Sequence, residues 1–110
     1  MLSQDFKEFV ELLNKNKVEY LIVGGYAVGI YGYPRYTGDL DVWIKPSLEN
    51  AEKMVIVIQE FGFASLGLTK EDFRTEGNVI QMGYPPFRID ILTRIDGVIF
   101  DHCYPYKNIF

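Results

Sequence analysis

The sequence predicts a single α/β (α+β) domain, in which a small mixed β-sheet is backed by helices. Three observations predict this fold. Helical and strand-like segments alternate along the chain, glycine and proline separate them, and 48% of the 110 residues are hydrophobic. A chain of this length and composition can bury a core without disulfides or a structural metal. We therefore expect one domain over residues 1–110, with helices packed on one face of the sheet.

The periodicity of the hydrophobic residues predicts each element in turn. In the first half of the chain we expect a helix over 4–16, a strand over 18–23, a helix over 26–31 and a strand over 40–44. In the second half we expect a helix over 48–61 capped by Ser47, a loop over 62–70, and strands over 78–83 and 87–92. A turn at 84–86 joins the last two strands, and the aromatic segment 96–110 has no clear pattern.

The composition also excludes several classes of protein. With one cysteine, Cys103, and one histidine, His102, the chain can form no internal disulfide and is a poor candidate for a thiolate zinc site. The net charge of −4 does not indicate nucleic-acid binding, although a local basic patch remains compatible with it. The N-terminus lacks the features of a signal peptide, and no apolar run is long enough to span a membrane. We expect a cytoplasmic protein.

Two aspartates in the fourth segment carry the first chemical signal. Asp39 and Asp41 lie two residues apart, and side chains at that spacing on a strand project from the same face. Two adjacent carboxylates repel each other unless cations or protons neutralise them. Mg²⁺ is the expected neutraliser, because it prefers oxygen ligands and shares them with phosphates.

A third acid and a glycine pair extend this signal. Asp90 lies within the apolar strand FRIDIL, where a buried carboxylate is costly without a partner. With Asp39 and Asp41 it would complete a site for two Mg²⁺ ions, of the kind that clamps the oxygens of an in-line phosphoryl displacement. Gly24-Gly25 follows a strand and opens a helix, so its backbone N–H groups can approach a phosphate closely.

The glycines and the first two acids also have a structural interpretation. Gly24-Gly25 is equally suited to a plain turn between strand and helix. Asp39 fits a turn before the strand, and Asp41 fits an exposed strand position.

The remaining residues of interest have such alternatives too. Asp90 could pair with Arg88 or Arg94 on a solvated edge. Trp43, which should share a face with Asp41, would line a nucleotide pocket or simply pack in the core. Taken singly, each signal is therefore weak, and the combination carries the argument.

The combination resembles the DNA polymerase β-like nucleotidyltransferase superfamily. The resemblance covers roughly residues 4–92 and rests on three motifs, namely Gly24-Gly25, Arg35-x-Thr37-x-Asp39-x-Asp41 and Asp90. It is greatest for the small bacterial and archaeal nucleotidyltransferases, some of which belong to toxin–antitoxin pairs. Many relatives have Gly-Ser in place of Gly-Gly, and relatives usually continue further beyond the third acid than this chain does.

The resemblance implies a role for each motif residue. Asp39, Asp41 and Asp90 would be catalytic residues that bind two Mg²⁺ ions, and Asp90 would help to deprotonate an acceptor hydroxyl. The glycine pair, Gly24 and Gly25, would contact the phosphates of ATP or another nucleoside triphosphate. Arg35 and Thr37 would contact phosphate or support the loop.

The resulting hypothesis is an enzyme. A Mg²⁺-dependent nucleotidyltransferase would move a nucleoside monophosphate from a nucleoside triphosphate to a hydroxyl of a protein, an RNA end or a small molecule, and release pyrophosphate. The alternative is a catalytically inactive module of the same fold that binds or regulates a partner, for example in a toxin–antitoxin pair. The aromatic tail would suit a partner protein or a homodimer interface.

Overall fold

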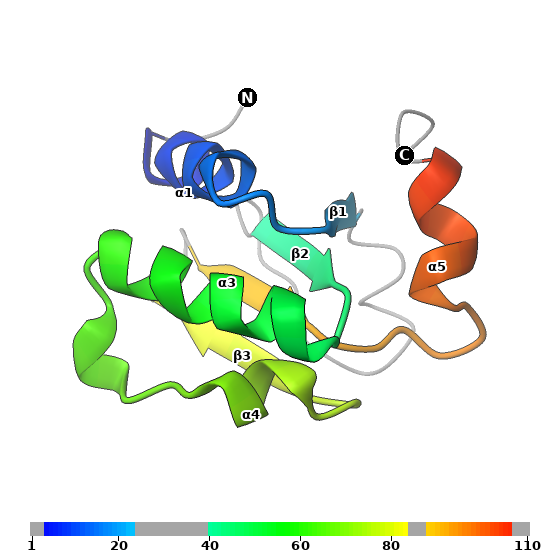
Figure 1. Ribbon diagram of the computed structural model, residues 1–110. Coiled ribbons are helices and arrows are strands. Elements are labelled where there is room, and N and C mark those ends of the chain that lie inside the picture. Colours follow the sequence, from blue (N-terminus) through cyan, green and yellow to red (C-terminus); the bar gives the residue numbers. More distant parts are fainter. Residues whose placement is uncertain (1–3, 24–39, 84–87, 107–110) are drawn as a thin grey trace.

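The computed structural model describes residues 4–23, 40–83 and 88–106 of the chain. Within these ranges it contains a four-stranded mixed sheet and four α-helices (Figure 1). The expected small mixed α/β architecture is thereby confirmed. The helix expected over 26–31 and the turn expected at 84–86 lie outside the described residues.

The sheet has the strand order β1-β2-β4-β3. Its strands are β1 (Tyr20–Val23), β2 (Leu40–Ile44), β3 (Val79–Met82) and β4 (Ile89–Leu92), each within two residues of its expected bounds. The central pair, β2 and β4, is parallel, and each outer strand runs antiparallel to its neighbour. Every residue of β2 and β4 is buried, which is typical of parallel strands covered on both faces.

In the part of the chain that the structure describes, three helices cover the first face of the sheet. They are α1 (Gln4–Lys15), α3 (Leu48–Glu60) and the short α4 (Lys70–Arg74) (Figure 1). Their apolar side chains meet those of the strands in one core, whose fully buried members include Phe9, Leu13, Val42, Ile44, Met54, Val57, Phe73 and Ile91. The spacing of apolar residues in α1 and α3 follows the helical period, and so the expected helices over 4–16 and 48–61 are confirmed.

A fourth helix lies on the opposite face, which corrects the expectation of helices on one face only. Phe100, in α5 (Phe100–Cys103), packs with Trp43 of β2, and both belong to a second apolar cluster with Leu21, Leu92 and Ile95. The rings of Trp43 and Phe100 meet edge to face, with centroids 5.2 Å apart. In the segment that has no clear pattern in the sequence, α5 is followed by a 3₁₀ turn at Tyr104–Tyr106.

The segment expected as a loop over 62–70 contains a 3₁₀ turn at Ala64–Leu66 and leads directly into α4. The start of α4 is fixed locally, because the Asp72 carboxylate accepts a hydrogen bond of 2.7 Å from the backbone N–H of Thr69. Phe73, fully buried, anchors the helix to the core. Five residues are too few to give a helical period in the sequence, which is why α4 was missed.

Asn50 joins the first turn of α3 to two strands. Its side-chain oxygen accepts from the backbone N–H of Glu19 (2.8 Å), and its amide nitrogen donates to the carbonyls of Glu19 (3.0 Å) and Lys45 (2.9 Å). The residue is only 2% exposed. A buried amide with three such bonds fixes the entry of β1, the exit of β2 and the start of α3 relative to one another.

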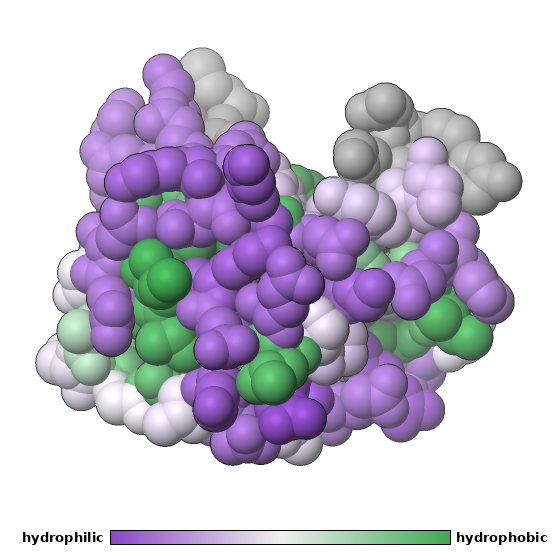
Figure 2. Space-filling view, viewed as in Figure 1, coloured by the Kyte–Doolittle hydropathy of each residue, from purple (hydrophilic) through white to green (hydrophobic). Residues whose placement is uncertain are grey.

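None of the helices in the described part of the chain has both the length and the apolar character needed to cross a membrane. Figure 2 shows that, on the face it presents, apolar residues form separate patches among polar ones. Large apolar side chains that reach the surface are Ile22, Leu48, Ile56, Leu66, Val98 and Ile99.

Candidate functional site

Asp41 and Asp90 lie side by side on the two central strands. They are Cα register partners on parallel β2 and β4, where neighbouring strands are about 4.8 Å apart. Register partners project from the same face of a sheet, so the two carboxylates share one face. The structure thus brings together two of the three acids that the sequence singled out.

This face is the one that carries α5. Leu40 and Val42 belong to the core under α1 and α3, so Asp41, between them, projects from the opposite face together with Trp43. The expectation that Asp41 and Trp43 share a face is confirmed. Asp41 is only 1% exposed, and therefore the alternative of an exposed strand acid is wrong.

Both acids lie in the interior of the sheet rather than on an outer strand. The strand order places β2 and β4 in the centre, and Asp90 is only 2% exposed. The solvated edge considered for Asp90 is therefore not found. Two ionised carboxylates in so buried a place require cationic partners to offset their repulsion and their loss of hydration.

Arg88 supplies one such cation. Its Nε donates to Oδ1 of Asp90 at 2.9 Å, and its Nη2 donates to Oδ2 at 3.2 Å. The pair is bidentate and buried, with the side chains of Arg88 and Asp90 10% and 2% exposed. Of the two arginines considered from the sequence, Arg88 is therefore a partner of Asp90, while Arg94 pairs with Asp96 (3.1 Å) on the surface.

The other predicted site residues lie outside the described residues. These are Gly24, Gly25, Arg35, Thr37 and Asp39. The described chain ends before this stretch at Val23, which is the register partner of Asp41, and resumes at Leu40, directly before Asp41. Both points of attachment of residues 24–39 are therefore next to the acid pair.

The acids that are described offer part of a cation site. Two carboxylates on one face at adjacent strand positions provide the oxygen donors that Mg²⁺ prefers. Within the described ranges, no three His, Cys, Asp or Glu side chains gather in a group that could hold a metal ion. The donor chemistry fits Mg²⁺, and a third carboxylate would have to come from Asp39, the residue directly before Leu40.

A cleft of about 610 Å³ lies at the other end of the central strands. It is lined by residues that follow β2 and β4 and by the segment leading into α5, including Lys45, Ser47, Thr93, Val98 and Asp101. Asp41 and Asp90 are not among its lining residues, since each is the second residue of its strand. The cleft and the acid pair are separate features.

Trp43 lies between these two features, because it lines the cleft and shares a face with Asp41. The residue is 4% exposed, and no described residue accepts a hydrogen bond from its buried indole N–H. Trp43 thus combines the packing role considered from the sequence with a place in the lining of the cleft.

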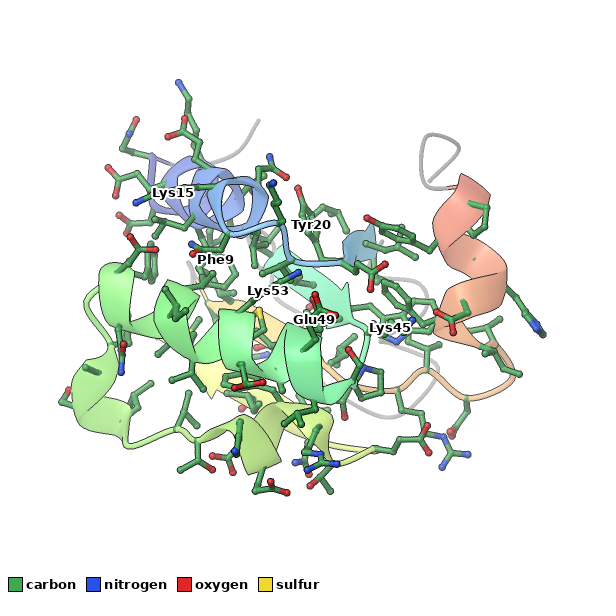
Figure 3. All side chains as sticks on the ribbon, viewed as in Figure 1. Phe9, Lys15, Tyr20, Lys45, Glu49 and Lys53 are labelled. Carbon is green, nitrogen blue, oxygen red and sulfur yellow. The ribbon has the colours of Figure 1, made fainter. Side chains whose placement is uncertain are left out.

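Lys45 (Figure 3) directly follows β2 and lines the cleft together with Asp101 of α5. Its Nζ lies 3.1 Å from Asp101 and 4.0 Å from Glu19. The hydrogen bond with Asp101 and the negative charges of Asp101 and Glu19 raise the pKa of Lys45. Lys45 is therefore held as a cation that links the sheet to α5.

Comparison of the chain with known protein families, with curated proteins and with solved structures finds no match in any of the three. The resemblance to nucleotidyltransferases therefore remains an expectation from the motif residues of the sequence.

The sequence contained a signal for the Arg88–Asp90 pair but not for the cleft. Arg88 lies two residues before Asp90, so the extended strand places both on one face. The existence of the cleft depends on how the segment between β4 and α5 packs on the sheet, and no local sequence pattern predicts this packing.

Proposed function

We propose that this protein is a Mg²⁺-dependent nucleotidyltransferase. The single observation that supports this most is the register pairing of Asp41 with Asp90 on adjacent parallel strands, with both carboxylates on one face. The sequence motif requires an acid of the Asp-x-Asp pair and the third acid to lie together. Two strands separated in the sequence by α3, α4 and β3 bring them to neighbouring positions.

The fold also supports a role for the glycine pair. Gly24-Gly25 directly follows Val23, the register partner of Asp41. A phosphate bound by the backbone N–H groups of these glycines would thus lie next to the end of β1, the strand that neighbours Asp41. In this proposal Gly24 and Gly25 bind the triphosphate, and Arg35 and Thr37 contact phosphate or support the loop.

Asp39, Asp41 and Asp90 would hold two Mg²⁺ ions. When bound, Mg²⁺ supplies positive charge that stabilises an in-line phosphoryl displacement. In the transfer itself, the acceptor hydroxyl gives its proton to Asp90 and its oxygen forms a bond to the α-phosphorus. The bond between the α-phosphorus and the bridging oxygen breaks, and pyrophosphate leaves. The acceptor is a protein hydroxyl, an RNA end or a small molecule.

Transfer of label from each α-³²P-labelled nucleoside triphosphate tests this activity. We expect Mg²⁺-dependent label on the protein itself or on added RNA, resolved on a denaturing gel. Asp41→Asn and Asp90→Asn should each lower the transfer by about a hundredfold, the scale of losing one electrostatic group in an active site. Asp96→Asn is the matched control, since Asp96 is a surface residue paired with Arg94.

A second function, a non-catalytic binding or regulatory module of the same fold, is favoured by one observation. Arg88 already gives Asp90 a buried, bidentate cation, as a purely structural acid would require. In this case the protein would bind a partner, for example within a toxin–antitoxin pair, and show no metal-dependent nucleotide binding. Asp90→Asn would then lower stability without changing any nucleotide signal.

A further inference from the structure

Arg88 is held in place at the acid pair from two directions. Its side chain makes the bidentate contact with Asp90, at 2.9 and 3.2 Å. Its backbone carbonyl accepts a hydrogen bond of 2.9 Å from the N–H of Leu40, the residue between Asp39 and Asp41. The guanidinium therefore lies on the same strand pair, and at the same end of it, as the predicted metal ligands.

The guanidinium and a metal ion compete for the same oxygens. Arg88 directs two N–H groups at the two oxygens of Asp90, and a hard cation would take its ligands from these oxygens. Arginine keeps its charge at every pH at which proteins fold, so it cannot leave the site by losing a proton. A metal ion can bind Asp90 fully only if the guanidinium turns away.

On the basis of the proposed function, we propose that Arg88 is the built-in counter-cation of this site and makes metal binding depend on nucleotide. Without nucleotide, Arg88 neutralises Asp90 and keeps the affinity for divalent cations low. A nucleoside triphosphate brings negative charge to the site. The displaced guanidinium can then bind its phosphate oxygens, because the planar donors of arginine match phosphate geometry. Arg88 is thus a positioning residue that acts through Asp90.

The test is the binding of Mn²⁺, as a spectroscopically visible substitute for Mg²⁺, to the full chain without nucleotide. Electron paramagnetic resonance measures the unbound ion directly. Arg88→Gln should bind Mn²⁺ about tenfold more tightly than the wild type, because Asp90 no longer has its internal cation. Arg88→Lys, which keeps a charge but loses the bidentate geometry, should lie between them. Arg94→Gln, which breaks only the surface pair with Asp96, should match the wild type.

Thermal unfolding provides a second readout and covers a variant that folds poorly. Arg88→Gln leaves a buried carboxylate without its arginine, so its melting temperature should fall, and Mn²⁺ should raise it more than it raises that of the wild type. If Arg88→Gln does not fold, Arg88→Lys serves for both measurements.

The nucleotide dependence completes the test. Adding a non-hydrolysable nucleoside triphosphate analogue should tighten Mn²⁺ binding strongly in the wild type and much less in the Arg88 variants. The wild type could bind metal and nucleotide while both Arg88 variants bind Mn²⁺ no more tightly than the wild type. That result would overturn the counter-cation role and leave the transferase proposal standing. Absence of Mn²⁺ binding in every chain, with and without the analogue, would overturn both.

Discussion

At the scale of single residues, Asn50 shows how a buried amide replaces several backbone contacts. The three bonds tie the start of α3 to Glu19 and Lys45, which are themselves joined by a backbone hydrogen bond of 3.2 Å from the Lys45 N–H to the Glu19 carbonyl. Asn50→Ala removes all three and takes the side-chain partner away from the part-buried N–H of Glu19 and carbonyl of Lys45. We expect the free energy of unfolding to fall by about 2–4 kcal/mol, measured by urea denaturation.

The matched control for Asn50 is Asn14→Ala. Asn14 makes an exposed hydrogen bond of 2.8 Å with the hydroxyl of Tyr20. Its loss should cost less than about 1 kcal/mol, because water can replace an exposed partner. Equal losses of unfolding free energy at the two positions would show that the Asn50 bonds do not stabilise the contact between α3 and the two strands.

Burial also determines how Asp41 and Asp90 should be understood. Each is at most 2% exposed, so neither acid can be a solvated surface charge. A buried carboxylate needs compensating positive charge, and Arg88 provides it for Asp90. The buried pair with Arg88 suits both a structural role and the proposed functional role of Asp90, and ligand measurements separate the two.

At the scale of elements, one ion pair connects the ends of α1 and α3. The Nζ of Lys15 (Figure 3) lies 2.7 Å from Oε2 of Glu60, and Asn16 donates to Oε1 at 2.8 Å. These contacts, the Lys15 hydrogen bond first, lower the pKa of Glu60 below its ordinary value of 4.5. The folded protein therefore favours the ionised carboxylate.

This shift predicts a pH dependence of stability. The contribution of Glu60 is present above pH 4.5 and is lost as the pH falls through the lowered pKa, since protonation removes the preference for the folded state. The difference in unfolding free energy between wild type and Glu60→Gln should thus shrink in acid, measured by urea denaturation from pH 7 to pH 3. Glu52→Gln, an exposed change on the same helix, is the control. A difference that stays constant over this range would contradict the assignment.

The sequence predicted most of these elements, and the misses have a common cause. β2 was predicted with its observed bounds because the apolar residues Leu40, Val42 and Ile44 occupy every second position of LDVWI. The helices α4 and α5 have only five and four residues, fewer than a period needs to show. Burial of Phe73 and Phe100 stabilises them, and burial depends on the whole fold.

The candidate site was predictable only in part, for a similar reason. Strand periodicity places Asp41 and Asp90 on faces of their own strands, but not next to each other. Their pairing depends on the strand order, in which β4 lies between β3 and β2. The motif resemblance, rather than any local pattern, indicated that the two acids are adjacent. The bidentate Arg88 contact required atomic positions.

At the scale of the whole molecule, the two faces of the sheet differ in their cover. Among the described residues, the first face carries three helices, while α5 packs on the second. Phe100 is 5% exposed and stacks on Tyr104 as well as meeting Trp43. Phe100→Ala should cost about 3 kcal/mol of unfolding free energy. It should also shift the fluorescence of Trp43, the single tryptophan, to longer wavelength.

Ile99→Ala is the control for this prediction, because Ile99 is 59% exposed. Its effect on stability should be small, within about 0.5 kcal/mol, and the emission should not shift. Unchanged Trp43 fluorescence in Phe100→Ala would show that α5 does not shield the second face in solution.

In the proposed transferase, the acid pair of β2 and β4 forms part of a metal and nucleotide site. The most direct test is equilibrium titration with ATP, CTP, GTP and UTP, with and without Mg²⁺, of the wild type, Asp41→Asn, Asp90→Asn and the control Asp96→Asn. We predict binding of at least one nucleotide that requires Mg²⁺, is lost in the first two variants and persists in the control. A folded wild type that binds none of the four in the presence of Mg²⁺ would contradict the claim and favour the partner-binding module.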